Sequence, residues 1–108
     1  MEAIAEKVIV LDGEPEDVIR QIASYLPPDA ITSSLWTSIR IDGTINYYPD
    51  RNCFTVSDKD GNTIFQLSYE NGEYELYIND EGVLIKTKVP LYVEADTFGH
   101  VALVVRED

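Results

Sequence analysis

Cysteine, histidine and basic residues are scarce in this chain of 108 residues, which has one cysteine, one histidine and eight lysines and arginines. Because Cys53 is the sole cysteine, no disulfide can form within the chain, as is typical of proteins from a reducing compartment. The sequence begins without the basic segment and apolar run of a secretory signal, and no apolar run approaches the roughly 18 residues of a membrane span. We therefore expect a cytoplasmic protein.

The sequence motifs of common enzymes are also missing. There is no Walker loop, no dinucleotide-binding glycine pattern, no His-Glu-x-x-His and no nucleophile elbow. A catalytic histidine needs an orienting acid and a reacting group within reach, but His100 has no such local pattern, and twenty acids make a nearby carboxylate uninformative. We predict that the chain is not an enzyme and uses no cofactor.

One segment, Asp58-Lys59-Asp60-Gly61-Asn62, has a superficial similarity to a calcium-binding loop. An EF-hand requires glycine at the sixth position and a bidentate acid at the twelfth, whereas the glycine here is fourth. The segment also lies between two predicted strands, where Asp-Gly is a common turn. We therefore expect a hairpin turn and no metal site.

A surplus of acidic residues is the most unusual property of the sequence. Twenty acids and eight bases give a net charge of −12. The surplus is spread along the chain, with −5 over residues 1–54 and −7 over residues 55–108, so it is not an acidic tail. Such a charge repels nucleic acid and anionic membranes and attracts basic protein surfaces.

The first third of the chain has the pattern of a strand followed by one helix. Residues 7–11 are nearly all apolar or β-branched, which predicts a short buried strand. Pro15 is typical of a first helical turn, and Pro27-Pro28 stops the helix after about twelve residues. Helical spacing relates the apolar residues Val18, Ile19, Ile22, Tyr25 and Leu26. We expect no second helix of this length.

Alternating strands separated by turn dipeptides fill the remainder of the chain. Two-residue turns at Asp60-Gly61, Asn71-Gly72 and Glu81-Gly82 would put one set of apolar side chains on one face. The predicted opposite pairs are Val56 and Phe65, Phe54 and Leu67, Leu67 and Leu76, Phe65 and Ile78, Tyr69 and Tyr74, Ile78 and Ile85, and Leu76 and Thr87. These turns predict a four-stranded meander over about residues 52–88.

Further strands are predicted on both sides of this meander. A three-residue bulged turn at Asp42-Gly43 would set Ile39 opposite Ile45. Pro90 interrupts the ladder, after which residues 91–94 indicate an edge strand and residues 101–105 a final buried strand. We predict one α+β domain over residues 1–108: an antiparallel β-meander of about six to eight strands, curved around a single N-terminal α-helix.

The candidate binding residues lie on the outward side of the meander. Alternation with buried residues turns Glu73, Glu75 and Tyr77 outward, and Glu70 is expected opposite Glu73. The chain thus has a candidate acidic, tyrosine-bearing docking surface, with Trp36 and Tyr48 as candidate aromatic anchors. The alternatives are a solvated face that prevents aggregation and aromatic residues that belong to the core.

Charge and missing enzyme motifs together favour a non-catalytic interaction protein. It would bind and inhibit or mask a basic partner protein, for example by imitating the charge of nucleic acid. In size and charge the chain is similar to phage-encoded inhibitors and bacterial immunity proteins, a likeness that assigns no residue a role. Two alternatives stay open: an accessory subunit or homodimer formed through an edge strand, and a small enzyme or ligand-binding domain that uses the concave sheet face.

Overall fold

Strands and one α-helix make up most of the protein. The computed structural model describes residues 7–34, 37–95 and 100–105. Within these residues the elements follow one another as β1 (Lys7–Leu11), α1 (Pro15–Tyr25), the 3-10 helix η1 (Pro28–Ala30), β2 (Ile31–Ser34), β3 (Ser38–Asp42), β4 (Thr44–Tyr48), the 3-10 helix η2 (Pro49–Arg51), β5 (Cys53–Ser57), β6 (Thr63–Glu70), β7 (Glu73–Ile78), β8 (Val83–Thr87), β9 (Leu91–Ala95) and β10 (His100–Val105).

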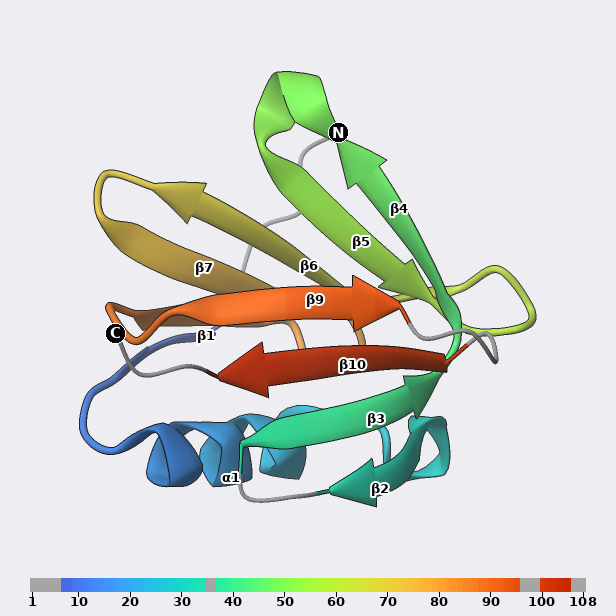
Figure 1. The fold of residues 1–108 in the computed structure, drawn as a ribbon, viewed down its shortest axis with the longest axis horizontal. Helices are drawn as coiled ribbons and strands as arrows, with labels where there is room; N and C mark the ends of the chain where they lie inside the picture. The colour runs from blue at the N-terminus through green and yellow to red at the C-terminus, as the bar shows by residue number, and fades with distance from the viewer. Residues whose placement is uncertain (1–6, 35–36, 96–99, 106–108) are drawn as a thin grey trace.

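The strands form two sheets (Figure 1). Sheet A has six strands in the order β1-β8-β7-β6-β5-β4, and sheet B has four in the order β2-β3-β10-β9. The predicted α+β class with an antiparallel meander is confirmed, since β4 to β8 run antiparallel in sequence order. The prediction of six to eight strands in one meander is too low, since the described residues contain ten strands in two sheets. The chain leaves sheet B for sheet A after β3.

That change of sheet occurs at Gly43, the single residue between β3 and β4. A Cβ atom at Gly43 would lie 2.3 Å from the backbone oxygen of Ser57, so only glycine lets the chain pass this close to β5. The predicted hairpin with Ile39 opposite Ile45 is therefore wrong: β3 pairs with β2 and β10, and β4 pairs with β5. We call this junction of the two sheets the corner end.

The three turns of the meander differ in how well the sequence predicts them. Asn71-Gly72 is the expected two-residue turn with both residues at positive φ, and all three predicted pairs between β6 and β7 are present. The predicted pairs between β5 and β6 are also present, although a bulge after Val56 makes the connection longer than two residues. At Glu81-Gly82 the predicted register of β7 and β8 is wrong by two residues. Ile78 lies opposite Val83 instead of the predicted Ile85, because the loop between the strands has four residues and not two.

Helix α1 and the two sheets enclose one core. The helix contacts β3 and β10 of sheet B, and its Val18, Ile19 and Ile22 are buried, as the helical spacing predicts. Sheet A contributes the fully buried Phe65 and Leu76 from its inner face, which is the face toward sheet B and the helix. No helix in the described part of the chain is long and apolar enough to cross a membrane.

The first and last strands occupy different positions from one another. Strand β1 pairs parallel with β8 at the edge of sheet A, so the prediction of a buried strand is wrong: Val8 is 55% and Val10 is 63% exposed. Strand β10 lies inside sheet B between β3 and β9, and its Val101, Leu103 and Val105 are buried as predicted. Strand β9 is the edge strand that was expected after Pro90.

Candidate functional site

Five of the six sequence-predicted binding residues lie on the outer face of sheet A, the face opposite the core. Glu70 of β6 lies opposite Glu73 of β7. Glu75 of β7 and Tyr48 of β4 lie in one row across the sheet, with Ser68 and Cys53 between them. Tyr77 is in the neighbouring row on the same face. The sixth residue, Trp36, lies outside the described residues, so its role as an anchor stays a prediction.

This outer face is less uniformly acidic than the alternation alone suggested. Lys86 of β8 lies directly across from Glu75, and Val10 of β1 lies next to Lys86 in the same row. Leu84 lies across from Tyr77. The acidic character is thus strongest where Glu70 and Glu73 face each other beside the β6–β7 turn, and it is partly balanced towards β8 and β1.

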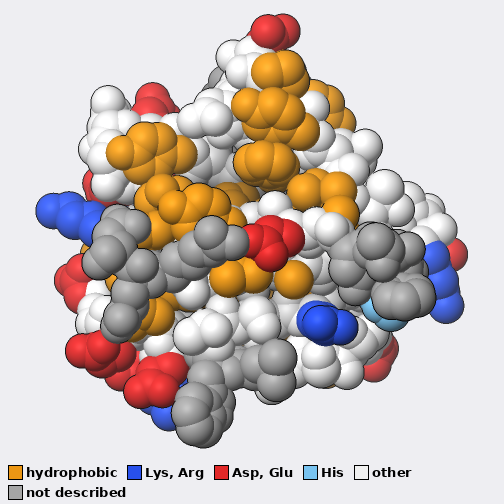
Figure 2. Space-filling model, in the orientation of Figure 1, with side chains coloured by type: hydrophobic (Ala, Val, Ile, Leu, Met, Phe, Trp, Pro, Cys, Tyr) orange, Lys and Arg blue, Asp and Glu red, His pale blue; other side chains and the backbone are white. Residues whose placement is uncertain are grey.

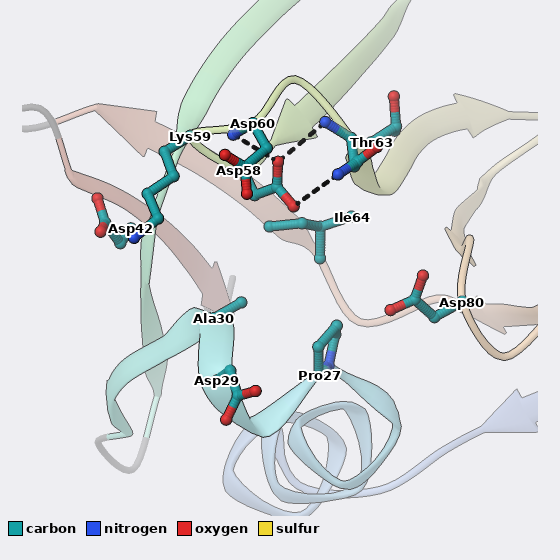
Figure 3. Close-up of a pocket in the computed structure, with 11 residues that line it drawn as sticks. Pro27, Asp29, Ala30, Asp42, Asp58, Lys59, Asp60, Thr63, Ile64 and Asp80 are labelled. Atoms are coloured by element: carbon teal, nitrogen blue, oxygen red, sulfur yellow. Dashed lines mark hydrogen bonds between the residues drawn. The ribbon is translucent and has the colours of Figure 1, made fainter.

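The second candidate region is a concave, aspartate-rich surface at the corner end. A pocket of about 360 Å³ is lined by five aspartates from four segments, namely Asp29, Asp42, Asp58, Asp60 and Asp80, together with Lys59. Figure 3 shows Asp42 and Lys59 on one side of this pocket and Asp80 on the other. Among the described residues, no group of three or more His, Cys, Asp or Glu side chains is arranged to hold a metal ion. Carboxylates also form charge-assisted hydrogen bonds with cationic side chains.

Asp58 serves the structure of the β5–β6 connection. One carboxylate oxygen accepts hydrogen bonds from the backbone N–H groups of Asp60 and Asn62, both at 2.9 Å. The hydrogen bond from the Asn62 backbone, with those from Asp60, Gly61 and the Asn62 side chain, lowers the pKa of the Asp58 carboxyl. The predicted turn at this place is therefore stabilised by its first residue.

The third region is an aromatic groove between the inner face of sheet A and strand β9 of sheet B. The groove has a volume of about 270 Å³, and Leu67 and Leu91, both buried, lie among its lining residues. Its rim includes Tyr69, Tyr74 and Tyr92, whose rings lie 4.7 Å and 6.5 Å apart in succession. Figure 2 shows hydrophobic side chains gathered over β4, β5, β9 and the β6–β7 hairpin, with a hollow between them.

The aromatic residues of this region are well exposed, including Tyr69 and Tyr47, which lie on the inner face of sheet A, and Tyr92, which alternates with the buried Leu91 on edge strand β9. Tyr69 is 47% exposed and Tyr92 37%, and Tyr47, whose ring lies 4.6 Å from that of Phe54, is 52% exposed. The inner-face pattern of β6 contains a signal that sequence reasoning missed. It changes from Phe65 and Leu67 to Tyr69, and tyrosine is the residue whose hydroxyl prefers to stay in water.

Cys53 and His100, the cysteine and the histidine that the sequence offers for nucleophilic or acid-base chemistry, line neither the aspartate-lined pocket nor the aromatic groove. Cys53 lies on the outer face of sheet A, as the alternation predicts, and is half-buried. Burial raises the pKa of its thiol, and the charge of Arg51 lowers it in part. A half-buried thiol of raised pKa is a weak nucleophile.

No protein-family model, curated protein or solved structure matches this chain. The molecule has three candidate surfaces: the outer face of sheet A, the aspartate-lined pocket and the aromatic groove. Each of them offers carboxylates or tyrosine rings, which are groups that bind cations and apolar surfaces.

Proposed function

We propose that this chain is a non-catalytic, acidic interaction protein that binds a basic partner protein in the cytoplasm and inhibits or masks it. The observation that carries the proposal is the convergence of like charges that are distant in the sequence. Five aspartates from four segments surround one pocket that contains a single lysine, and Glu70 opposes Glu73 on sheet A. Such arrangements cost stability in the free protein, and a cationic partner relieves that cost.

Charge of this kind determines how the complex forms. A net charge of −12 accelerates association with a basic surface and makes binding weaker as salt increases. If the partner binds nucleic acid, the carboxylates occupy the place of phosphates, and the two ligands exclude each other. Inhibition then follows from masking a basic groove, with no chemical step.

A salt-dependent capture experiment tests this function. The full chain is immobilised, exposed to cell lysate at low salt and eluted with a salt gradient, and the eluted proteins are identified by mass spectrometry. We expect basic proteins that leave the column as salt rises and that added DNA displaces. A retained set without excess positive charge, or one that salt does not release, would contradict the proposal.

A charge-reversal variant provides the matched comparison. Glu73→Lys/Glu75→Lys changes two residues on the outer face of sheet A and reduces the net charge from −12 to −8, since each substitution adds two units. We expect it to retain less of the basic partner at every salt concentration. An unchanged elution profile would show that the outer face of sheet A takes no part.

A second candidate function, a homodimeric accessory subunit, is favoured by one observation. Strand β1 is an edge strand, and its Val8 and Val10 are more than half exposed. Exposed β-branched residues on an edge strand favour pairing with another chain. Light scattering over a range of concentrations distinguishes the two functions: a monomer at all concentrations excludes the homodimer, whereas a dimer that Val10→Lys dissociates supports it.

A further inference from the structure

The aromatic groove differs from the other two candidate surfaces because it combines depth, ring faces and apolar surface. Its tyrosines come from both sheets: Tyr69 and Tyr74 from the β6–β7 hairpin of sheet A and Tyr92 from β9 of sheet B. Tyr92 is 37% and Tyr69 47% exposed, and both lie beside buried leucines, so part of the apolar surface of the groove is in contact with water. In a monomeric protein such a patch, rimmed by polar groups, marks an interaction site.

The surroundings of the groove are mainly acidic. Glu70 and Glu73 lie at the tip of the β6–β7 hairpin on the outer face of sheet A, next to Tyr69 and Tyr74 in the sequence, and exposed Glu94 lies on β9, the strand that forms the opposite wall. The residues that line the groove itself are uncharged. Figure 2 shows acidic side chains at the top, the left and the lower rim of the hydrophobic area, and basic side chains at its left edge and just below it. A ligand that fits both properties is therefore cationic and flat or elongated.

We propose that the aromatic groove binds an extended, arginine-bearing segment of the basic partner, with guanidinium groups stacked on the rings of Tyr69, Tyr74 and Tyr92. Arginine fits because its planar, weakly hydrated cation stacks on aromatic faces while it pairs with carboxylates. An extended segment fits because the groove runs between two sheets and because the partner's side chains alternate, one set entering the groove and the other facing solvent. This inference rests on the proposed function and assigns it a site.

A second copy of the chain is a poor occupant of the same groove. Each copy has a net charge of −12, and the acidic residues beside the groove would face those of the other copy. Like charges brought together in this way oppose association, whereas an arginine-rich segment carries the opposite charge and is attracted to the chain.

The test uses peptides of defined composition and two tyrosines of nearly equal exposure. The probes are ten-residue peptides of alternating alanine with arginine, lysine, glutamine or glutamate, titrated calorimetrically into the full chain. Tyr69→Ser removes a ring from the groove, and Tyr48→Ser removes one from the outer face of sheet A. Tyr69 is 47% and Tyr48 46% exposed, so both variants lose similar exposed area. Tyr69→Phe keeps the ring and removes only the hydroxyl.

We expect the arginine peptide to bind more tightly than the lysine peptide, and the neutral and acidic peptides to bind far more weakly. Tyr69→Ser should weaken binding of the arginine peptide about five-fold, which corresponds to about 1 kcal/mol for a lost cation–π contact, whereas Tyr69→Phe and Tyr48→Ser should change it less than two-fold. Thermal unfolding confirms that each variant is folded.

The failures of the two proposals are distinguishable. If Tyr48→Ser weakens the arginine peptide as much as Tyr69→Ser, or if the glutamine peptide binds as well as the arginine peptide, the groove is not the site. In that case salt-dependent capture of basic proteins would still support the function through another surface. If no basic protein is captured from the lysate while the arginine peptide binds in the groove, the groove is a peptide-binding site, but the proposed masking of a basic partner is wrong.

Discussion

The corner end and the opposite end of the sandwich are built from the same strands, yet they differ in how well the core is covered. At the corner end Gly43 joins the sheets, and the inner-face residues Val56 and Phe65 are fully buried. At the opposite end, which we call the open end, the inner-face Tyr69 is 47% exposed on the same strand as Phe65. Figure 1 shows β4 and β5 rising away from sheet B as they leave the corner.

This difference shows that the inner face of a sheet is buried only as far as the opposite layer reaches. In Figure 1 the tip of the β6–β7 hairpin, where Glu70 pairs with Glu73, lies well apart from β9 of sheet B. Tyrosine suits this position, since its ring contacts the remaining apolar surface and its hydroxyl is hydrated. The aromatic groove is thus a direct consequence of how the sheets are joined.

The largest expected difference between the ends is in stability. Leu76→Ala creates a cavity in the closed part of the core and should lower the free energy of unfolding by about 2–5 kcal/mol. Tyr69→Ala, on the same face at the open end, should lower it by less than about 1 kcal/mol. Urea unfolding of both variants measures these losses. Equal losses of unfolding free energy would contradict the claim that the core is less well covered at the open end.

The corner itself should be nearly as sensitive. Gly43→Ala places a Cβ atom 2.3 Å from the Ser57 backbone oxygen, so two strands must move apart. We expect a loss of about 1–3 kcal/mol, the usual cost of overpacking. Asp42→Ala, an exposed neighbour on β3, is the control in the same urea experiment. A stable Gly43→Ala variant would show that the corner tolerates a wider separation.

A smaller effect should appear in acid at the corner end. Hydrogen bonds to its charged form lower the pKa of Asp58 in the folded state, so this group contributes stability above its unfolded pKa and loses it as the pH falls through the folded value. Asp58→Asn should therefore reduce the dependence of the urea midpoint on pH in the acidic range. Asp60→Asn is the matched control, because it removes one charge from the same loop and keeps the backbone hydrogen bonds to the Asp58 carboxylate.

The smallest effect concerns the thiol on the outer face of sheet A. Because burial raises the pKa of Cys53, its alkylation by iodoacetamide at mildly alkaline pH should be slower than that of a cysteine in an unstructured peptide. Arg51→Gln removes the charge that lowers this pKa and should slow the reaction further. Alkylation at the rate of the peptide would mean that the thiol is fully hydrated.

Local patterns in the sequence predict the helix and the central meander because both depend on neighbouring residues. Asn71-Gly72 determines the register of β6 and β7 through its positive φ angles. At Glu81-Gly82 the predicted register is two residues away from the structure, an even shift that leaves every side chain on its predicted face. The face of the sheet on which a side chain lies is therefore predicted more reliably than the residue that lies opposite it on the next strand.

Contacts between distant segments are what the sequence does not reveal. Asp42-Gly43 has the composition of a hairpin turn, and only the close approach of Ser57 makes it a corner between sheets. Strand β1 has the composition of a buried strand, but its parallel pairing with β8 at an edge leaves Val8 and Val10 exposed. The alternation correctly places Glu70, Glu73, Glu75 and Tyr77 on one face of sheet A. The groove, in contrast, depends on Tyr92, which lies 18 residues beyond Tyr74.

Nuclear magnetic resonance of the tyrosine rings tests the docking of a cationic segment at the open end most directly. The seven tyrosines lie on different surfaces, so each ring signal reports on its own surface when the arginine peptide is added. We predict that the signals of Tyr69, Tyr74 and Tyr92 shift together and saturate, while those of Tyr48 and Tyr77 stay in place. Shifts confined to Tyr48 and Tyr77 would move the binding surface to the opposite face of sheet A and contradict the account.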